Sequence, residues 1–327
     1  MKPFEKDFYK GAQPSTLCVG CGHDQISKHL IQACFESQID PVQLAKISGI
    51  GCSSKTPNYF LNRAQGFNTI HGRMASIATG VKVAHSQLKI LGVSGDGDTG
   101  SIGLGSFLHT IKRNVPMIYL IENNGVYGLT KGQFSATALK ETSTKSYKNN
   151  PFYPLDLCRL ALEAGCGFVA RSFSGDKKQL INLLKLALKY EGFALIDIVS
   201  PCVAYGNQED FPYSFSSMKT NTIVLNELDF IEEGPKKEDT LRLPDGSLLE
   251  IKKRETKNYD PTNLKMASDI LKDESEKNQI ITGLIYYKEK ETFLKQAKIL
   301  KKPLVSLEEK EIRPSSDALK KIMNLFV

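Results

Sequence analysis

The spacing of apolar side chains along the first part of the chain distinguishes helices from strands. If this stretch is helical, one side of the helix carries four apolar residues: Ile26, Leu30, Ala33 and Cys34. Short, mostly apolar runs such as 88–93 are typical of strands that are buried on both faces. We therefore predict alternating strands and helices from about residue 20 to residue 200.

This alternation predicts an α/β fold, in which helices cover both faces of a doubly wound, mostly parallel sheet. Ligands of such folds bind at the carboxyl ends of the strands. The segments rich in Gly, Asp and Asn fall at these ends. The strands are expected at 44–47, 88–93, 116–121, 168–170 and 193–199. The helices are expected around 24–34 and at 72–85, 104–111, 155–164 and 177–190.

The pattern changes after about residue 235, where the density of charged residues rises. Residues 243–247 are a turn signal between two short alternating runs, which predicts a hairpin. A helix through Met266 and Ile270 and a strand at 280–287 are expected beyond it. We divide the chain into a main domain, 1–235, and a C-terminal extension, 236–327, which we interpret as a docking arm or a cap.

The composition is ordinary for a globular protein, with 41% hydrophobic and 24% charged residues. No run approaches the roughly 18 apolar residues of a membrane span. The charged first ten residues do not resemble a secretory signal, so a cytoplasmic location is expected. The net charge of +7 is spread along the chain without an aromatic–basic motif, which argues against nucleic acid as a partner. A solvated Lys-rich surface, or a face that attracts an acidic partner, accounts for this charge.

A Gly-Asp-Gly-Asp motif at 95–98 follows a predicted strand and opens a helix. Glycines let a diphosphate approach the backbone, and a helix N-terminus offers it unpaired N–H groups. Because a carboxylate repels phosphate, Asp96 is expected to bind Mg²⁺ between the two. The next strand ends in Asn-Asn-Gly-Val at 123–126, whose amide and carbonyl oxygens suit the same ion. The two motifs together predict a magnesium–diphosphate site.

The pair of motifs resembles the thiamine-diphosphate signature, in which Asn-Asn follows Gly-Asp-Gly at a similar distance. That resemblance implies that Asp96, the Asn124 side chain and the Val126 backbone carbonyl hold Mg²⁺. It also implies that four residues line the diphosphate: Gly97, Asp98, Gly128 and Leu129.

Seven cysteines in a chain without an export signal favour metal or redox chemistry over disulfides. Cys18 and Cys21 form a C-x-x-C motif, and Cys52 and Cys202 each follow a predicted strand. Four thiolates there suit either zinc or a cubic iron–sulfur cluster, and the spacing does not separate the two. The predicted thiamine site favours the cluster, because thiamine chemistry creates an electron-rich carbon from which a cluster can accept electrons. Buried, inert thiols are expected at the remaining positions: Cys34, Cys158 and Cys166.

Together these motifs resemble the β subunits of 2-oxoacid:ferredoxin oxidoreductases over essentially the whole chain. The motifs that carry the resemblance lie at 18–23, 49–54, 71–73, 95–98, 123–133 and 200–202. It implies that one [4Fe–4S] cluster is bound by Cys18, Cys21, Cys52 and Cys202. It also implies that six residues pack around thiamine diphosphate: Ile50, Gly51, Cys52, Ser53, Thr69 and His71.

The same resemblance implies a coenzyme A-dependent oxidative decarboxylation of a 2-oxoacid, with electrons passing through the cluster to ferredoxin. Lys131 favours 2-oxoglutarate, with succinyl-CoA as product, because its flexible ammonium group can reach a second carboxylate. The family places the glutamate that activates thiamine on an α subunit. A partner α subunit is therefore expected, in an αβ or (αβ)₂ assembly.

Three alternatives stay open at this point. The chain could belong to a non-redox thiamine enzyme of the decarboxylase or synthase type, with a structural zinc ion at the cysteines. It could be a non-catalytic, metal-bound adaptor. Within the oxidoreductase interpretation, pyruvate or another 2-oxoacid could be the substrate.

Overall fold

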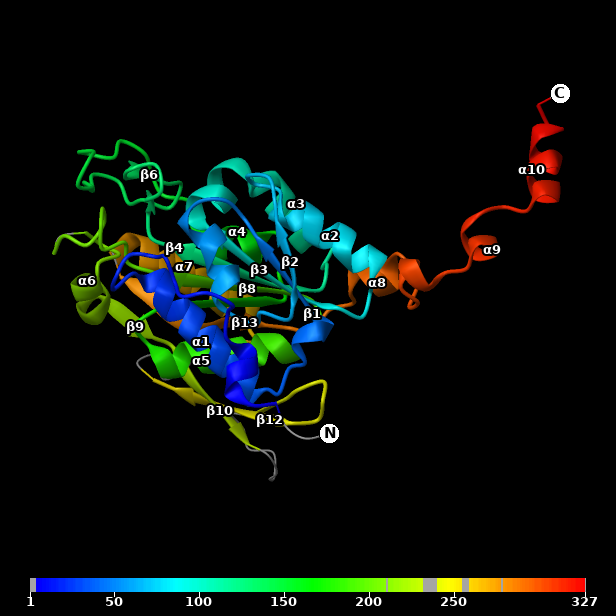
Figure 1. Ribbon diagram of the computed structural model, residues 1–327. Helices are drawn as coiled ribbons and strands as arrows, with labels where there is room; N and C mark the ends of the chain where they lie inside the picture. Colours follow the sequence, from blue (N-terminus) through cyan, green and yellow to red (C-terminus); the bar gives the residue numbers. More distant parts are fainter. Residues whose placement is uncertain (1–3, 210, 232–239, 255–258, 278, 327) are drawn as a thin grey trace.

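The computed structural model describes residues 4–209, 211–231, 240–254, 259–277 and 279–326. Its centre is an eight-stranded sheet with the order β2-β1-β3-β4-β8-β7-β13-β9 (Figure 1). The first six strands run parallel, β13 is antiparallel to β7, and β9 is parallel to β13. The predicted α/β fold with a mostly parallel sheet is therefore confirmed. In sheet order the strands are Gln65–Asn68, Leu44–Ser48, Lys89–Gly95, Met117–Asn123, Phe193–Val199, Phe168–Phe173, Ile280–Tyr287 and Thr222–Val224.

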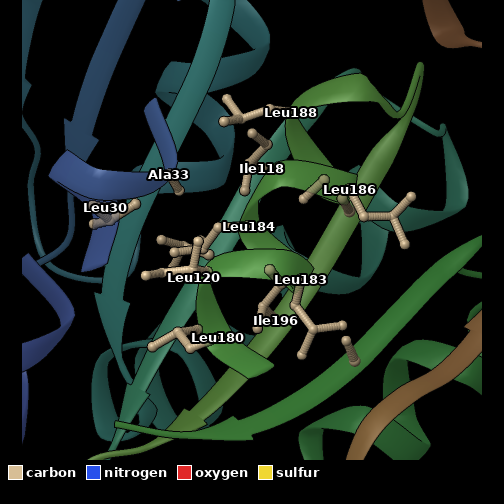
Figure 2. Packing of buried hydrophobic residues seen from close by; sticks show 14 of the residues in the cluster. Leu30, Ala33, Ile118, Leu120, Leu180, Leu183, Leu184, Leu186, Leu188 and Ile196 are labelled. Atoms are coloured by element: carbon tan, nitrogen blue, oxygen red, sulfur yellow. The ribbon is translucent and has the colours of Figure 1, made fainter. Parts of the chain in front are cut away.

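Helices cover both faces of this sheet, because side chains of successive strand residues point to opposite faces. One face packs against α1 (Gly22–Glu36) and α5 (Lys177–Lys189). Figure 2 shows Leu180, Leu184 and Leu188 of α5 on the side of the helix near α1 and the strands, and Leu183 and Leu186 on the other side. The other face packs against α2 (Met74–Ala84), α3 (Leu104–Lys112), α4 (Leu157–Glu163) and α7 (Leu264–Lys277).

The predicted hairpin around 243–247 forms between β11 (Thr240–Arg242) and β12 (Leu248–Lys253). These strands and β10 (Asn226–Ile231) make a second, three-stranded sheet, which packs against α5. In contrast, β13 lies within the main sheet, so this part of the expected extension is integral to the domain. The proposed boundary at residue 235 falls outside the described residues.

The remaining elements are short. The first group lies around the carboxyl edge of the main sheet and consists of η3 (Cys52–Tyr59), η4 (Asp98–Ile102), β5 (Val126–Tyr127), β6 (Gln133–Phe134) and α6 (Phe215–Thr220). The others are η1 (Lys6–Tyr9), η2 (Pro41–Gln43), α8 (Phe293–Gln296), η5 (Leu304–Ser306), α9 (Glu309–Ile312) and α10 (Ser316–Met323). Figure 1 shows α9 and α10 extending away from the domain toward the C-terminus. Among the described residues, no helix is both long and apolar enough to span a membrane.

Candidate functional site

The parallel register brings the carboxyl ends of five strands to one edge of the sheet. Ser48 at the end of β1 pairs with Asn68 of β2 and Val93 of β3. Gly95 of β3 pairs with Glu122 of β4. Asn123 of β4 pairs with Val199 of β8. The loops that follow these strands carry almost all of the predicted site residues, so the sheet places them side by side.

Asp96 lies at the centre of this edge and is 2% exposed. Its Oδ2 accepts hydrogen bonds from the hydroxyls of Ser135 and Thr137, the latter at 2.6 Å. Its Oδ1 accepts a long hydrogen bond of 3.4 Å from the backbone N–H of Asn124. Burial raises the pKa of the Asp96 carboxyl, and these hydrogen bonds oppose the rise. A buried carboxylate is costly without a cation, so the chemistry of this position fits a metal ligand.

Asn124 adjoins Asp96, and Val126 adjoins Asn124. Both residues are buried, and the Oδ1 of Asn124 accepts a hydrogen bond of 3.0 Å from the N–H of Val126. The structure thus brings the three predicted Mg²⁺ ligands together. They supply a carboxylate, an amide and a carbonyl, all of which are oxygen donors suited to Mg²⁺.

The loop at 95–98 is glycine-rich for two distinct reasons. A Cβ on Gly97 would lie 2.4 Å from the ring of Tyr127, whose hydroxyl donates a 3.0 Å hydrogen bond to the Gly97 carbonyl. At Gly95, a Cβ would lie 3.3 Å from the hydroxyl of Ser53. That hydroxyl is buried and has no hydrogen-bond partner among the described residues. An unpaired buried donor beside this loop fits an anionic group such as a diphosphate.

Asp98 joins two loops through its carboxylate. It accepts hydrogen bonds from the Gly72 N–H at 2.7 Å and the Ser94 hydroxyl at 2.6 Å, and it contacts Nδ1 of His71. Thr69 donates a 2.8 Å hydrogen bond to the carbonyl of Ser48. The loop after β2 is therefore held against the ends of β1 and β3. Because the Asp98 carboxylate is used in this way, only its backbone remains to line a diphosphate as predicted.

Four cysteines gather at the same edge. Cys52 and Cys202 each place Sγ 3.5 Å from the position that a Cβ on Gly128 would occupy. Burial raises the pKa of Cys21 to about 12 and that of Cys52 to about 11, and the neighbouring Cys202 contributes to both. Cys18, which is exposed, contributes to the raised pKa of Cys52 and of Cys202. Cys202 is thus a neighbour of the other three cysteines, and Cys52 is also a neighbour of Cys18.

No disulfide joins any of the seven cysteines, all of which lie in the described residues, and Cys34, Cys158 and Cys166 are buried in the core. A hydrogen bond of 3.2 Å from the Gly22 N–H to the Pro201 carbonyl joins the C-x-x-C segment to the loop that carries Cys202. The described residues contain no group of three or more His, Cys, Asp or Glu side chains placed to hold a single metal ion.

A buried polar layer beneath the cysteines was not predicted from the sequence. Both carboxylate oxygens of Glu122 lie 2.9 Å from the Thr56 hydroxyl, and Oε2 lies 3.8 Å from Nδ1 of His23. Nδ1 of His23 also shares a hydrogen bond with the hydroxyl of Ser200. Burial raises the pKa of Glu122 well above its ordinary value and lowers that of His23 to about 4. At neutral pH, His23 is therefore neutral.

The segment from β5 to β6 connects the surroundings of Asp96 and Asn124 with those of the cysteines. Val126 lies beside Asn124, and Gly128 lies between the thiols of Cys52 and Cys202. Leu129 is 56% exposed, and Lys131 is exposed with a φ of 79°, which is uncommon for a side chain of its kind. Lys131 thus lies at the rim of the site and not in its buried part.

Comparison with known proteins decides the family. Residues 42–198 match the model of the thiamine pyrophosphate enzyme C-terminal TPP-binding domain. Over 261 residues, 33% are identical to 2-oxoglutarate synthase subunit KorB of Methanocaldococcus jannaschii, an alignment that covers 78% of this chain and 94% of that protein. The chain belongs to the 2-oxoacid:ferredoxin oxidoreductase β subunits. The structure is also similar to a 2-oxoglutarate:ferredoxin oxidoreductase from Magnetococcus marinus with 2-oxoglutarate, coenzyme A and succinyl-CoA bound, at 29% identity and a TM-score of 0.77.

That structural match covers 99% of this chain and 97% of the other. A further relative in the family is the 2-oxoacid:ferredoxin oxidoreductase subunit beta of Saccharolobus solfataricus, which is 41% identical over 191 residues. This alignment spans 58% of the chain and 63% of the length of that relative. The family and the thiamine-binding domain are therefore established by similarity.

Replacing Glu122 with Gln is expected to stabilise the folded chain, relative to the unsubstituted one, increasingly as the pH rises above the ordinary glutamate pKa of 4.5. The folded pKa of Glu122 lies above its ordinary value of 4.5, so the unfolded state loses this proton first and stability falls as the pH rises. Gln carries no such proton. The difference in unfolding free energy between the variant and the unsubstituted chain therefore changes by at most about 1.4 kcal/mol per pH unit. Denaturant titrations at several pH values measure it.

Glu163→Gln is the matched control, because Glu163 is exposed on α4. Its unfolding free energy should follow that of the unsubstituted chain at every pH. A pH-independent difference for Glu122→Gln would contradict a raised pKa at Glu122.

Proposed function

We propose that this chain is the β subunit of an enzyme that oxidatively decarboxylates a 2-oxoacid with coenzyme A and passes the electrons to ferredoxin. One observation carries the proposal: the Asp96–Asn124 site and the four cysteines share one sheet edge, and a single segment touches both. Val126 adjoins the first and Gly128 the second. A magnesium-bound coenzyme and an electron acceptor placed there would be neighbours. The names of the relatives agree with this activity.

The first cofactor of the proposal is thiamine diphosphate with Mg²⁺, for which the matched domain supports the coenzyme. Asp96, the Asn124 side chain and the Val126 carbonyl would hold the ion. Gly97, Gly128, Leu129 and the backbone of Asp98 would line the diphosphate. The coenzyme supplies an electron sink at the carbon that loses CO₂. The residues proposed to pack around it are Ile50, Gly51, Cys52, Ser53, Thr69 and His71.

The second cofactor is a [4Fe–4S] cluster held by Cys18, Cys21, Cys52 and Cys202. Thiols must lose their protons to bind metal. The raised pKa values of Cys21 and Cys52 mean that these thiols stay protonated until a metal centre binds. A cluster would accept electrons one at a time, whereas a structural zinc ion would not. The cluster therefore fits the oxidoreductase proposal and zinc fits the non-redox alternative.

The proposed substrate is 2-oxoglutarate, with succinyl-CoA as product. The related structure from Magnetococcus marinus has 2-oxoglutarate, coenzyme A and succinyl-CoA bound. Lys131, at the exposed rim of the site, would reach the distal carboxylate of the substrate. Pyruvate lacks that carboxylate, so Lys131 would add less to its binding.

The proposed partners are an α subunit, which would supply the glutamate that activates thiamine, and ferredoxin. Turnover then requires both subunits, in an αβ or (αβ)₂ assembly in the cytoplasm. Only the end of the C-terminal extension, 236–327, is proposed as a docking arm, because β13 within that range belongs to the main sheet. Its last helix, α10, and the residues after it expose large apolar side chains that need a partner surface: Leu319, Ile322, Met323, Leu325 and Phe326.

Thiamine diphosphate and Mg²⁺ together are expected to raise the Tm of the complex of this chain with its α subunit, because ligands that bind only the folded state stabilise it. Asp96→Ala should abolish the shift by removing the carboxylate proposed to bind Mg²⁺. Asp269→Ala, on the exposed face of α7, is the control and should keep the shift. Differential scanning fluorimetry measures it. A full shift in Asp96→Ala would refute this metal site.

Anaerobic purification of the complex should yield brown protein whose broad visible absorbance bleaches with dithionite. Cys52→Ala should lose this absorbance together with the bound iron and sulfide, because three thiolates remain for four irons. Cys34→Ala is the control, since Cys34 lies in the core. Colourless protein with stoichiometric zinc would instead support the non-redox enzyme.

Lys131→Ala is expected to lower kcat/KM for 2-oxoglutarate by about tenfold, the loss of roughly one charge-assisted hydrogen bond, and to change kcat/KM for pyruvate much less. Steady-state assays of the complex with coenzyme A and a viologen acceptor measure both. Lys145→Ala is the control, because Lys145 is exposed near the same loop. Equal losses on the two substrates would remove the argument for 2-oxoglutarate.

A further inference from the structure

A cavity of about 680 Å³ lies at the amino-terminal edge of the sheet, opposite the cofactor site. Lys89 and Ile90 at the start of β3 and Met117 and Ile118 at the start of β4 line it. Residues from the ends of α2 and α5 complete the inner wall. The volume is in the range of sites that bind small molecules. Because the cofactor site occupies the other ends of the same strands, the proposed reaction makes no use of this cavity.

The outer wall is a segment of the C-terminal part, residues 288–301, which we call the strap. Near its start, the side chain of Asn114 donates hydrogen bonds to the carbonyls of Lys290 and Glu291 at 3.2 and 3.1 Å. At its end, the hydroxyl of Ser86 lies 3.0 Å from the Leu300 carbonyl and 3.2 Å from the Lys301 carbonyl. The strap is thus attached at both ends, so the fold holds the outer wall of the cavity in place.

The charge of the cavity wall is strongly one-sided. Its charged residues are one glutamate, Glu191, and five lysines: Lys82, Lys89, Lys295, Lys298 and Lys301. Lys82 and Lys89 donate hydrogen bonds to the backbone carbonyls of Leu88 and Leu188, at 2.6 and 2.9 Å. Burial lowers the pKa of Lys82 to about 8. Within the described part of the chain, none of the five lysines forms an ion pair with a carboxylate, so the wall has a large excess of positive charge.

The rest of the wall is largely apolar and includes Ile90, Met117, Leu188, Leu294 and Ile299. Positive charge around an apolar floor suits a ligand with an anionic group on an apolar body. Such a ligand would offset the charge of the lysines and cover apolar surface at once. We propose that this cavity binds an organic anion of that class, a carboxylate or an organic phosphate with an apolar body, independently of the reaction at the opposite edge.

The test uses 8-anilinonaphthalene-1-sulfonate, an apolar sulfonate whose fluorescence rises on binding, with the full chain and with its complex. It should bind at one saturable site, more weakly as salt is added. Lys295→Glu with Lys298→Glu should raise Kd by about tenfold or more, because both exposed lysines line the cavity. Lys219→Glu with Lys265→Glu changes the net charge equally, away from the cavity, and should alter Kd less than about twofold.

Two competitors separate the possible sources of the ligand. Displacement of the dye by decanoate identifies a carboxylate with an apolar chain, and displacement by adenosine monophosphate identifies an organic phosphate. Displacement by neither would overturn the proposal. So would an unchanged Kd in the lysine double variant, or loss of the signal in Leu325→Ser with Phe326→Ser, which would place the dye on the exposed C-terminal tail. Salt dependence in the unsubstituted chain tests the electrostatic part without any substitution.

Discussion

The parallel register of β1, β3, β4 and β8 is the constraint on which the rest of the site depends. Parallel strands end at the same edge, so the loops after these four strands lie next to one another. The hydrogen bonds of Asp98 then set their relative positions, because its carboxylate holds Gly72 and His71 of one loop against Ser94 at the end of β3. A change at this single carboxylate would loosen the contacts of several proposed cofactor residues at once.

Burying the polar groups at this edge costs free energy, and hydrogen bonds within the protein offset that cost only partly. Asp96 is buried with its pKa raised, and the Ser53 hydroxyl has no partner among the described residues. Glu122 and His23 avoid part of this cost, since burial shifts each toward its neutral form. Asp96 cannot avoid the cost by becoming neutral if it is to bind a metal ion. A cation at the proposed site would offset the cost of burying the ionised Asp96 carboxylate.

Much of this architecture could be predicted from the sequence, because buried parallel strands are continuous apolar runs. β3, β4 and β8 were predicted within about two residues of their observed ends. β2 was missed because all four of its residues are exposed, so no apolar pattern marks it. β13 was predicted as a strand, but its antiparallel place beside β7 depends on long-range pairing that no local pattern encodes. The contacts of Asp98 with Gly72 and of Glu122 with Thr56 were missed for the same reason, because these partners lie far away in the sequence.

The cavity and the proposed cofactor site lie at opposite ends of the same two strands, which limits how one could influence the other. β3 spans seven residues, Lys89–Gly95, so the two edges are about 20 Å apart. At that distance two unit charges interact by less than about 1 kcal/mol at an effective dielectric constant of about 20, so a charge bound under the strap has little direct effect on Asp96. Any coupling must instead pass through packing, and α2 offers a direct route. Its C-terminal end contributes Lys82 to the cavity, while its N-terminus follows the loop that Asp98 holds in place.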